Sequence, residues 1–169
     1  MTRKSERISF LVNFISFPMA TNPSALTAHL GYWLRQVSNH VSQSFARKLA
    51  ARDVTVAEWA VMRMLLDRVP PSPSQLAEEM GMTRGAITKL ADRLLAKGLI
   101  GRRASHADGR SHTLHLTAQG ADLVPDLAAL ADANEAECFA HLPEADRATL
   151  RRILEETVHR LGLTATPIN

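Results

Sequence analysis

Two short helix patterns separated by a single glycine, Gly81, constrain this chain more than any other feature. Ser72 and Gln75 have the spacing of a capping box, and Pro73 fits the first position of a helix, so a helix is expected to begin there. Gly81 permits a sharp exit from that helix, and Thr83 can cap a second one. The pattern therefore predicts two short helices joined by a tight turn.

The second of these helices has two different faces. Apolar residues recur at helical spacing on one face and predict its buried side: Ile87, Leu90, Ala91 and Leu94. The remaining positions predict an outward side rich in basic and hydroxyl groups: Arg84, Gly85, Thr88, Lys89, Asp92 and Arg93. Guanidinium groups suit guanine edges and hydroxyls suit phosphates or bases, so this side is a candidate DNA-binding surface. The alternative is an ordinary solvated helix face.

A hairpin pattern follows the second helix. Gly98 ends the helix, and strands are expected over residues 100–103 and 113–116. The polar connection between the strands carries Asp108 and Arg110. Two helices followed by such a hairpin make a winged helix-turn-helix, in which the second helix enters a major groove and the hairpin reaches the neighbouring backbone or minor groove.

These elements resemble the MarR-type transcriptional regulators over about Ala28 to Leu161. The resemblance is carried by SQLAEEMGMTRGAITKLADRLLAKGLIGRR and DGRSHTLHLTAQG, which are fairly specific when they occur together in this order. It implies a wing arginine, Arg110, that enters the minor groove and is held by Asp108. The alternative is a hairpin tip that uses Asp-Gly only for its turn.

The candidate DNA-binding residues come from both parts of this module. They are Ser74, Thr83, Arg84, Gly85, Thr88, Lys89, Arg93, Asp108 and Arg110. Arg84 and Thr88 lie one turn apart and are expected to reach bases, while Lys89 and Arg93 are expected to contact the phosphate backbone. Thr83 lies at the amino end of the helix, which favours a phosphate.

Charge is distributed unevenly along a chain whose net charge is only +3. Between Arg84 and Arg110 there are seven cations and two acids, whereas between Thr117 and Arg160 there are nine acids and four arginines. A basic module beside an acidic one indicates a polyanionic partner for the first. Double-stranded DNA is therefore the expected partner.

Long helical patterns flank the module. One is expected from residue 22 to about residue 51, and two more from residue 117 to about 140 and from residue 143 onward. The first has an apolar stripe: Leu26, Leu30, Leu34, Val37, Val41 and Phe45. These helices are too long and too apolar on one face to remain solvated. The resemblance implies that they interlock in a homodimer, and two-fold symmetry then predicts a pseudo-palindromic DNA site.

The expected fold class is mainly α with a small β-wing. Residues 53–116 are predicted to form the winged helix-turn-helix, and residues 22–52 and 117–163 a helical dimerisation region. Residues 1–21 are either an N-terminal extension that packs on the dimer or a mis-assigned leader, in which case Met19 is the natural start. Basic residues before an apolar run also resemble a short signal peptide, but a DNA-binding function argues against export.

A small-molecule effector is expected because many proteins of the resembling family bind phenolic or aromatic acids. The candidate pocket residues lie on the two helices before the helix-turn-helix: Trp33, Arg35, His40, Trp59 and Met62. An aromatic wall with one cation or imidazole suits an aromatic carboxylate. Core packing is the alternative for Trp33, Trp59 and Met62.

Other chemistries have little support. No nucleophile triad, paired-acid site, P-loop or dinucleotide motif indicates an enzyme, and no cofactor is expected. The single cysteine, Cys138, is expected to be a small buried residue rather than a redox sensor, and His106, His112 and His115 lack the further ligand that a metal site needs. A single cysteine cannot form an internal disulfide, so a reducing cytoplasm is the expected location. No apolar run reaches the roughly 20 residues that a membrane helix needs. A winged-helix protein-interaction adaptor and a ligand-independent architectural DNA-binding protein are the alternative functions.

Overall fold

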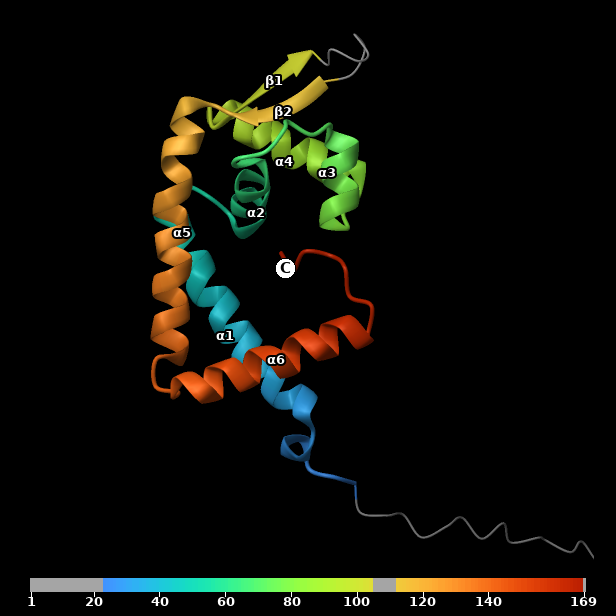
Figure 1. The fold of residues 1–169 in the computed structure, drawn as a ribbon, viewed down its shortest axis with the longest axis vertical. Helices are drawn as coiled ribbons and strands as arrows, with labels where there is room; N and C mark the ends of the chain where they lie inside the picture. The colour runs from blue at the N-terminus through green and yellow to red at the C-terminus, as the bar shows by residue number, and fades with distance from the viewer. Residues whose placement is uncertain (1–22, 105–111, 169) are drawn as a thin grey trace, which may run out of the picture. The chain divides into compact units, whose positions relative to one another are not determined.

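The structure is a computed structural model of the chain, and it describes residues 23–104 and 112–168. The described part is mainly helical with one two-stranded antiparallel sheet, which confirms the expected fold class (Figure 1). The elements are η1 (Leu26–Ala28), α1 (Leu30–Ala50), α2 (Val56–Leu65), α3 (Pro73–Met80), α4 (Arg84–Ala96), β1 (Ile100–Ala104), β2 (His112–Leu116), α5 (Ala118–Phe139) and α6 (Glu144–Arg160). The chain divides into two compact units, Met1–Arg35 and Gln36–Asn169. The predictions for residues 1–21, His106, Asp108 and Arg110 lie outside the described residues.

The first unit corrects the expected start of the long helix. A single turn of 3-10 helix covers Leu26–Ala28, and His29 then has extended backbone angles, so α1 begins only at Leu30. No side-chain hydrogen bond caps the start of η1 at Ala25. Within this unit the Trp33 indole N–H donates to the carbonyl of Thr27 at 2.9 Å, so Trp33 contacts its own N-terminal turn.

The second unit contains the helix-turn-helix, and its caps form as predicted. The Ser72 hydroxyl accepts from the N–H of Gln75 at 3.2 Å, and the Gln75 side chain accepts from the N–H of Ser72 at 2.8 Å. Gly81 ends α3 with a φ of 64°, a left-handed conformation that favours glycine. Thr83 then caps α4 by accepting from the N–H of Ala86. These contacts fix the angle at which α4 leaves the turn.

The β-hairpin is attached to the segment before α3 and to the end of α4. β1 and β2 pair from Ile100 opposite Leu116 to Ala104 opposite His112. The N–H of Leu114 donates to the carbonyl of Pro71 at 2.9 Å, and the Leu114 side chain is fully buried. The hairpin is therefore positioned by the segment before α3 as well as by the end of α4.

The core of this unit forms around α2, which packs against α4, α5 and β2. Its fully buried side chains include Leu49, Met62, Leu76, Met80, Ile87, Leu94, Leu114 and Leu127. The four residues predicted for the inner face of α4 all belong to this core, which confirms the predicted period of the helix. Because this face of α4 is buried in the core, the opposite face of the helix is exposed to solvent.

One buried carboxylate ties α2 to α4. Glu58 is 1% exposed, and its Oε2 accepts from the N–H of Thr55 at 2.9 Å and from the ammonium group of Lys97 at 3.1 Å. Lys97 also donates to the carbonyl of Asp53. Burial alone would raise the pKa of Glu58, but the bonds from Thr55 and Lys97 outweigh it and hold that pKa below its ordinary value.

Glu58→Gln is expected to destabilise the protein at neutral pH and to have little effect in acid. Because the pKa of Glu58 is lower in the folded chain, its stabilisation is present above the unfolded value of about 4.3 and is lost as the pH falls through the folded value. Glutamine keeps the capping box, so the loss is the charged hydrogen bond with Lys97, about 1–3 kcal/mol. Urea unfolding of both proteins measures this at neutral pH and at a pH below the folded value. An equal difference in unfolding free energy at both would contradict the expectation.

The C-terminal half continues with α5 and α6 and then turns back. Thr117 caps α5 by accepting from the N–H of Gly120, and Pro143 precedes α6 as expected. Cys138 on α5 is half-buried rather than buried, because it lies near the end of the helix beside exposed residues. After α6, the segment 164–168 returns toward α3, where the N–H of Thr166 donates to the carbonyl of Met80 at 3.2 Å (Figure 1).

Candidate nucleic-acid interface

The outer face of α4 is exposed and carries polar groups along its length. All six residues predicted for it are exposed: Arg84, Gly85, Thr88, Lys89, Asp92 and Arg93. Among residues 23–104 and 112–168, Arg84, Lys89 and Arg93 form no ion pair, so no described carboxylate neutralises them. The face therefore presents three cations to a polyanion.

The amino end of α4 adds backbone donors to this face. Its first turn contains no acidic residue, and the Thr83 side chain takes up the N–H of Ala86. The Thr88 hydroxyl donates to the carbonyl of Arg84 at 2.9 Å, which leaves its oxygen able to accept. Ser74, in the first turn of α3, is also exposed. Helix amino ends and hydroxyl groups are common phosphate ligands, so these positions suit a DNA backbone.

A contact that the sequence did not predict joins α4 to the hairpin. Asp92 on the outer face accepts from the Arg102 guanidinium of β1 at 2.6 Å. Both side chains are about half exposed, so the pair contributes little to stability, but it holds β1 against the outer face of α4. Alternation along β1 places Arg102 on one side of the strand, yet only the packed structure shows that Asp92 lies next to it.

Asp108 and Arg110, which the sequence places between the two strands, lie outside the described residues. In the hairpin, Arg103 and His112 are exposed, whereas His115 is half-buried. In the part of the chain that the structure describes, no three acidic, cysteine or histidine side chains form a group that could hold a metal ion.

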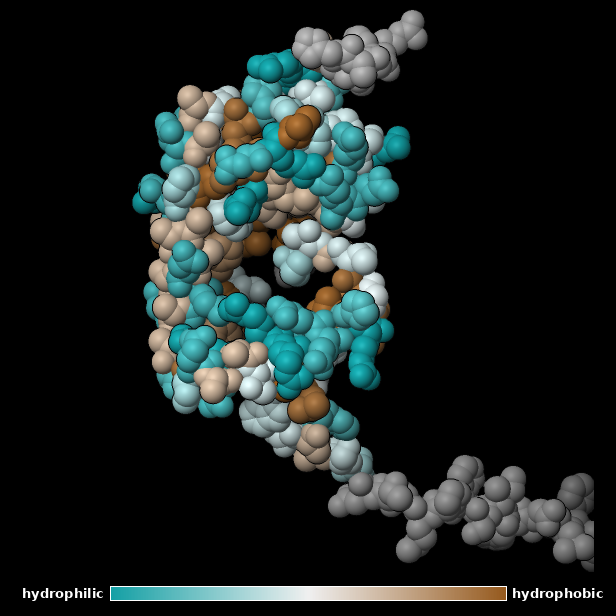
Figure 2. Space-filling model, viewed as in Figure 1, coloured by the Kyte–Doolittle hydropathy of each residue, from teal (hydrophilic) through white to brown (hydrophobic). Residues whose placement is uncertain are grey.

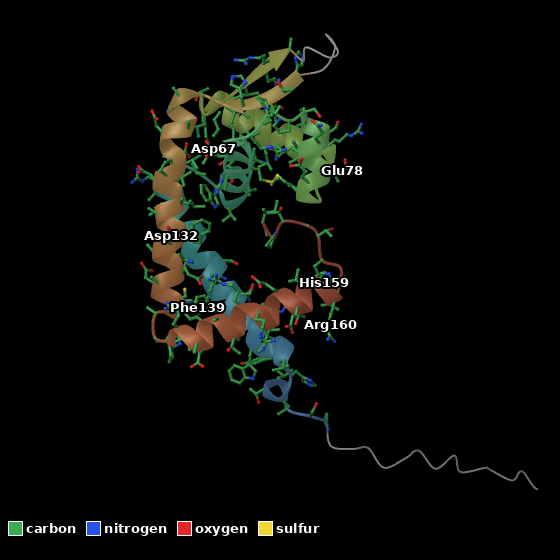
Figure 3. All side chains as sticks on the ribbon, viewed as in Figure 1. Asp67, Glu78, Asp132, Phe139, His159 and Arg160 are labelled. Atoms are coloured by element: carbon green, nitrogen blue, oxygen red, sulfur yellow. The ribbon has the colours of Figure 1, made fainter. Side chains whose placement is uncertain are left out.

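A second exposed surface lies on α6. Large apolar side chains at helical spacing are 37–66% exposed along it: Leu150, Ile153, Leu154, Val158 and Leu161. Phe139 lies at the end of α5 (Figure 3). It lines a groove together with Leu150, Leu154 and Val158. We call the five exposed residues the α6 apolar face. A continuous apolar face of this kind is unusual on an isolated chain.

The five predicted effector residues differ in their surroundings. Met62 is fully buried in the core, because its position on α2 faces α4 and α5, and core packing accounts for it. Trp33 and Arg35 belong to the first unit, while His40 is an exposed residue of the second. Trp59 alone of the five lines a cavity of about 590 Å³ among α1, α2, α5 and the C-terminal segment. Figure 2 shows the surface hollowed beside that segment, with hydrophobic residues on the wall.

Among the described residues, no helix is both long enough and apolar enough to cross a membrane.

Comparison with known proteins shows which family of proteins the helix-turn-helix and hairpin region resembles. The sequence model of the MarR family matches residues 54–112. A helix-turn-helix transcriptional repressor of Mycobacterium tuberculosis is 30% identical over 129 residues, which cover 76% of this chain and 93% of that protein. The likeness therefore extends well beyond the matched family region.

Solved structures have the same arrangement of elements. A probable transcriptional regulator from Pseudomonas aeruginosa is 27% identical with a TM-score of 0.70, covering 79% of this chain and 99% of the other. A cysteine-to-serine mutant of MarR from E. coli, solved as a complex with operator DNA, is 25% identical with a TM-score of 0.69, covering 76% and 93%. The exposed face of α4 thus occurs within a fold that another protein uses on DNA.

Proposed function

Because this chain belongs to the MarR family of transcriptional regulators, a family of DNA-binding proteins rather than enzymes, we propose that it is a dimeric, ligand-responsive repressor. It binds pseudo-palindromic promoter DNA in the cytoplasm and releases it when a small molecule binds. In this proposal residues 53–116 bind DNA, and residues 22–52 and 117–163 form the dimerisation region. The name of the related mycobacterial protein, a transcriptional repressor, supports repression rather than activation.

The observation that carries the proposal is the outer face of α4. Its cations Arg84, Lys89 and Arg93 are exposed and form no ion pair with the described residues, and the opposite face is completely buried. A helix held this way can enter a major groove, where an arginine reads guanine and a lysine binds phosphate. Arg84 and Thr88 are the proposed base contacts, and Ser74, Thr83, Gly85, Lys89 and Arg93 are the proposed backbone contacts.

The proposed homodimer rests on the α6 apolar face. Removing five large apolar side chains from water is favourable by about 25 cal/mol for each Å² of apolar area. A second copy of the same chain is the occupant that we propose, because a two-fold axis lets the same face pack against itself. Such a dimer presents two copies of α4 to two half-sites.

The proposed response to a ligand rests on the cavity lined by Trp59. Its volume of about 590 Å³ lies within the range of small-molecule sites. The cavity lies among helices of the proposed dimerisation region and α2 of the DNA-binding region. A molecule bound there contacts both parts and can therefore change their arrangement.

A mobility-shift experiment on the protein's own promoter region tests the regulator function. We expect a sequence-preferring shift at moderate salt, with competition by the specific fragment but not by unrelated DNA. The result that would overturn the proposal is a shift that all DNA fragments compete for equally, or no shift at all.

Arg110→Ala is expected to weaken operator binding and to flatten its salt dependence. The resemblance implies that this arginine enters the minor groove near the phosphates, so the substitution removes one cation per protomer from the interface. The slope of log affinity against log salt should fall by about 1 for each protomer. Arg160→Ala, at the end of α6, removes the same charge elsewhere and should leave the slope unchanged (Figure 3). An unchanged slope for Arg110→Ala would exclude the minor-groove role.

A further inference from the structure

The end of α6 reverses the direction of the chain. The N–H of Leu163 donates to the carbonyl of Val158 at 3.1 Å, and the N–H of Gly162 donates to the carbonyl of His159 at 3.1 Å, which is the bonding of a Schellman motif. Gly162 has a φ of 61°, and nothing lies within 4 Å of the place where its Cβ would be. This glycine therefore serves the backbone turn rather than packing. The turn directs residues 164–168 back toward α3 (Figure 1).

Residues 164–168 complete the C-terminal end of α3. A helix leaves its last four carbonyls without partners inside the helix, and α3 ends at Met80. The turn after α3 satisfies one of these carbonyls, because the N–H of Met82 donates to the carbonyl of Ala77 at 2.8 Å. The carbonyl of Met80 accepts instead from the N–H of Thr166 at 3.2 Å. The hydrogen bonding at this end of α3 thus depends on a distant part of the sequence.

The same segment lies against the turn between α3 and α4. A Cβ added to Gly81 would be 2.7 Å from the Cβ of Ala165 and 2.8 Å from its Cα, which is closer than non-bonded carbon atoms approach. Glycine at this position therefore permits both the left-handed end of α3 and the close approach of Ala165. Thr166 and Ile168 are half-buried and line a cavity together with Trp59 of α2. The segment thus contacts both the turn and the helix packed behind it.

We propose that residues 164–168 are a strap that fixes the helix-turn-helix relative to α6, with Thr166 as a positioning residue, and that this strap makes operator binding selective for the separation of the two half-sites. α6 carries the α6 apolar face of the proposed dimer, and the turn held by the strap leads directly into α4. The two copies of α4 are therefore held at a set separation. An operator with more distant half-sites is bound fully only when the strap is released. This inference rests on the proposed dimeric regulator and adds a device within it.

The strap resists displacement only with the free energy of its own contacts. One hydrogen bond corresponds to a factor of about two- to tenfold in an equilibrium constant. Each protomer releases its own strap on an operator of the wrong spacing, so a dimer loses at least about fourfold in affinity there.

Thr166→Pro tests the strap, because proline has no N–H to donate to Met80. The measurement is the ratio of affinities for an operator of native spacing and for one with a single base pair inserted between the half-sites. We expect Thr166→Pro to lower this ratio at least about fourfold, because the lengthened operator no longer breaks a contact. Thr166→Ala keeps the donor and removes only the hydroxyl, so it should keep the ratio of the unaltered protein. An unaltered ratio in Thr166→Pro overturns the inference, and so does an equal fall in Thr166→Ala.

Hydrogen exchange without DNA reports on the strap separately from the regulator function. The N–H of Met82 should exchange about two- to tenfold faster in Thr166→Pro and in a chain that ends at Leu163, but not in Thr166→Ala. None of residues 164–168 is fully buried, so the shortened chain keeps its core and serves as the second variant if Thr166→Pro does not fold. Unchanged exchange at Met82 in both overturns the strap.

The two measurements separate the two proposals. A protein that prefers one operator but shows neither the faster exchange nor the lower ratio has lost the strap alone. A protein whose turn exchanges faster but that prefers no operator overturns the regulator function, and with it the role of the strap in half-site spacing.

Discussion

Arg84→Ala is expected to lower the affinity for operator DNA by at least about 30-fold and to relax its base preference. Arg84 is exposed in the first turn of α4 and forms no ion pair with the described residues. A bidentate contact between arginine and guanine contributes about 1–3 kcal/mol, and a dimer makes it twice. Two losses of about 1 kcal/mol already amount to roughly 30-fold. The measurement is a binding isotherm on the operator and on operators with single substitutions in each half-site.

Lys89→Ala is the matched comparison because Lys89 is exposed on the same face but is proposed to contact phosphate. Its loss should weaken binding to all sequences uniformly and reduce the salt slope by about 1 for each protomer. Arg84→Ala should instead lose discrimination at particular base pairs. If both variants weaken specific and unrelated DNA to the same extent, Arg84 does not read bases and the proposed division of roles is wrong.

Local sequence signals were sufficient for the helix-turn-helix. Ser72 with Gln75, Gly81 and Thr83 each act on neighbours within a few residues, so their roles depend little on the remainder of the fold. The same is true of the buried face of α4, because the helical period alone selects Ile87 and its partners. The surface proposed to bind DNA could therefore be outlined from sequence.

Contacts between distant residues could not be predicted in this way. The Glu58–Lys97 pair joins residues that are 39 positions apart in the sequence. From sequence alone, Lys97 is interpreted as an exposed lysine and Glu58 as the glutamate of a capping box, and nothing indicates that the two meet. From sequence, an apolar residue such as Met62 fits the wall of a ligand cavity as well as the hydrophobic core. The packing of α2 shows that Met62 belongs to the core. The bond from the Asn134 amide nitrogen to the carbonyl of Val41 also joins residues far apart in the sequence, and no local pattern predicts it.

The start of α1 shows a different limit. The apolar spacing from Leu26 to Leu34 fits a helix, but periodicity does not reveal that His29 is extended. Leu26, Leu30 and Leu34 are more than half exposed, so no burial within the described chain enforces a regular helix there. The apolar spacing predicts which side chains are buried. Whether the backbone there is a regular helix depends on the tertiary contacts that bury them.

Ile153→Glu is expected to convert the proposed dimer to monomers and thereby to abolish tight operator binding. Ile153 lies in the middle of the α6 apolar face and is 47% exposed in the single chain, so the substitution should leave the protomer folded. In a two-fold dimer each copy loses roughly 2 kcal/mol of apolar burial, and the two losses together raise the dimer dissociation constant about 1000-fold. An unpaired buried carboxylate weakens the dimer further. Sedimentation at several concentrations measures the state of assembly, and circular dichroism checks the fold.

Ala148→Glu is the control, because it adds the same charge to α6 at an exposed position outside the apolar face. This variant should remain dimeric and bind the operator normally. Each Ile153→Glu monomer keeps an intact α4, so it should still bind DNA with the weak, salt-sensitive affinity of one half-site. A dimeric Ile153→Glu protein would show that the subunits associate through another surface. A monomeric variant with full operator affinity would show instead that one protomer is sufficient, and the pseudo-palindromic site would then lose its physical basis.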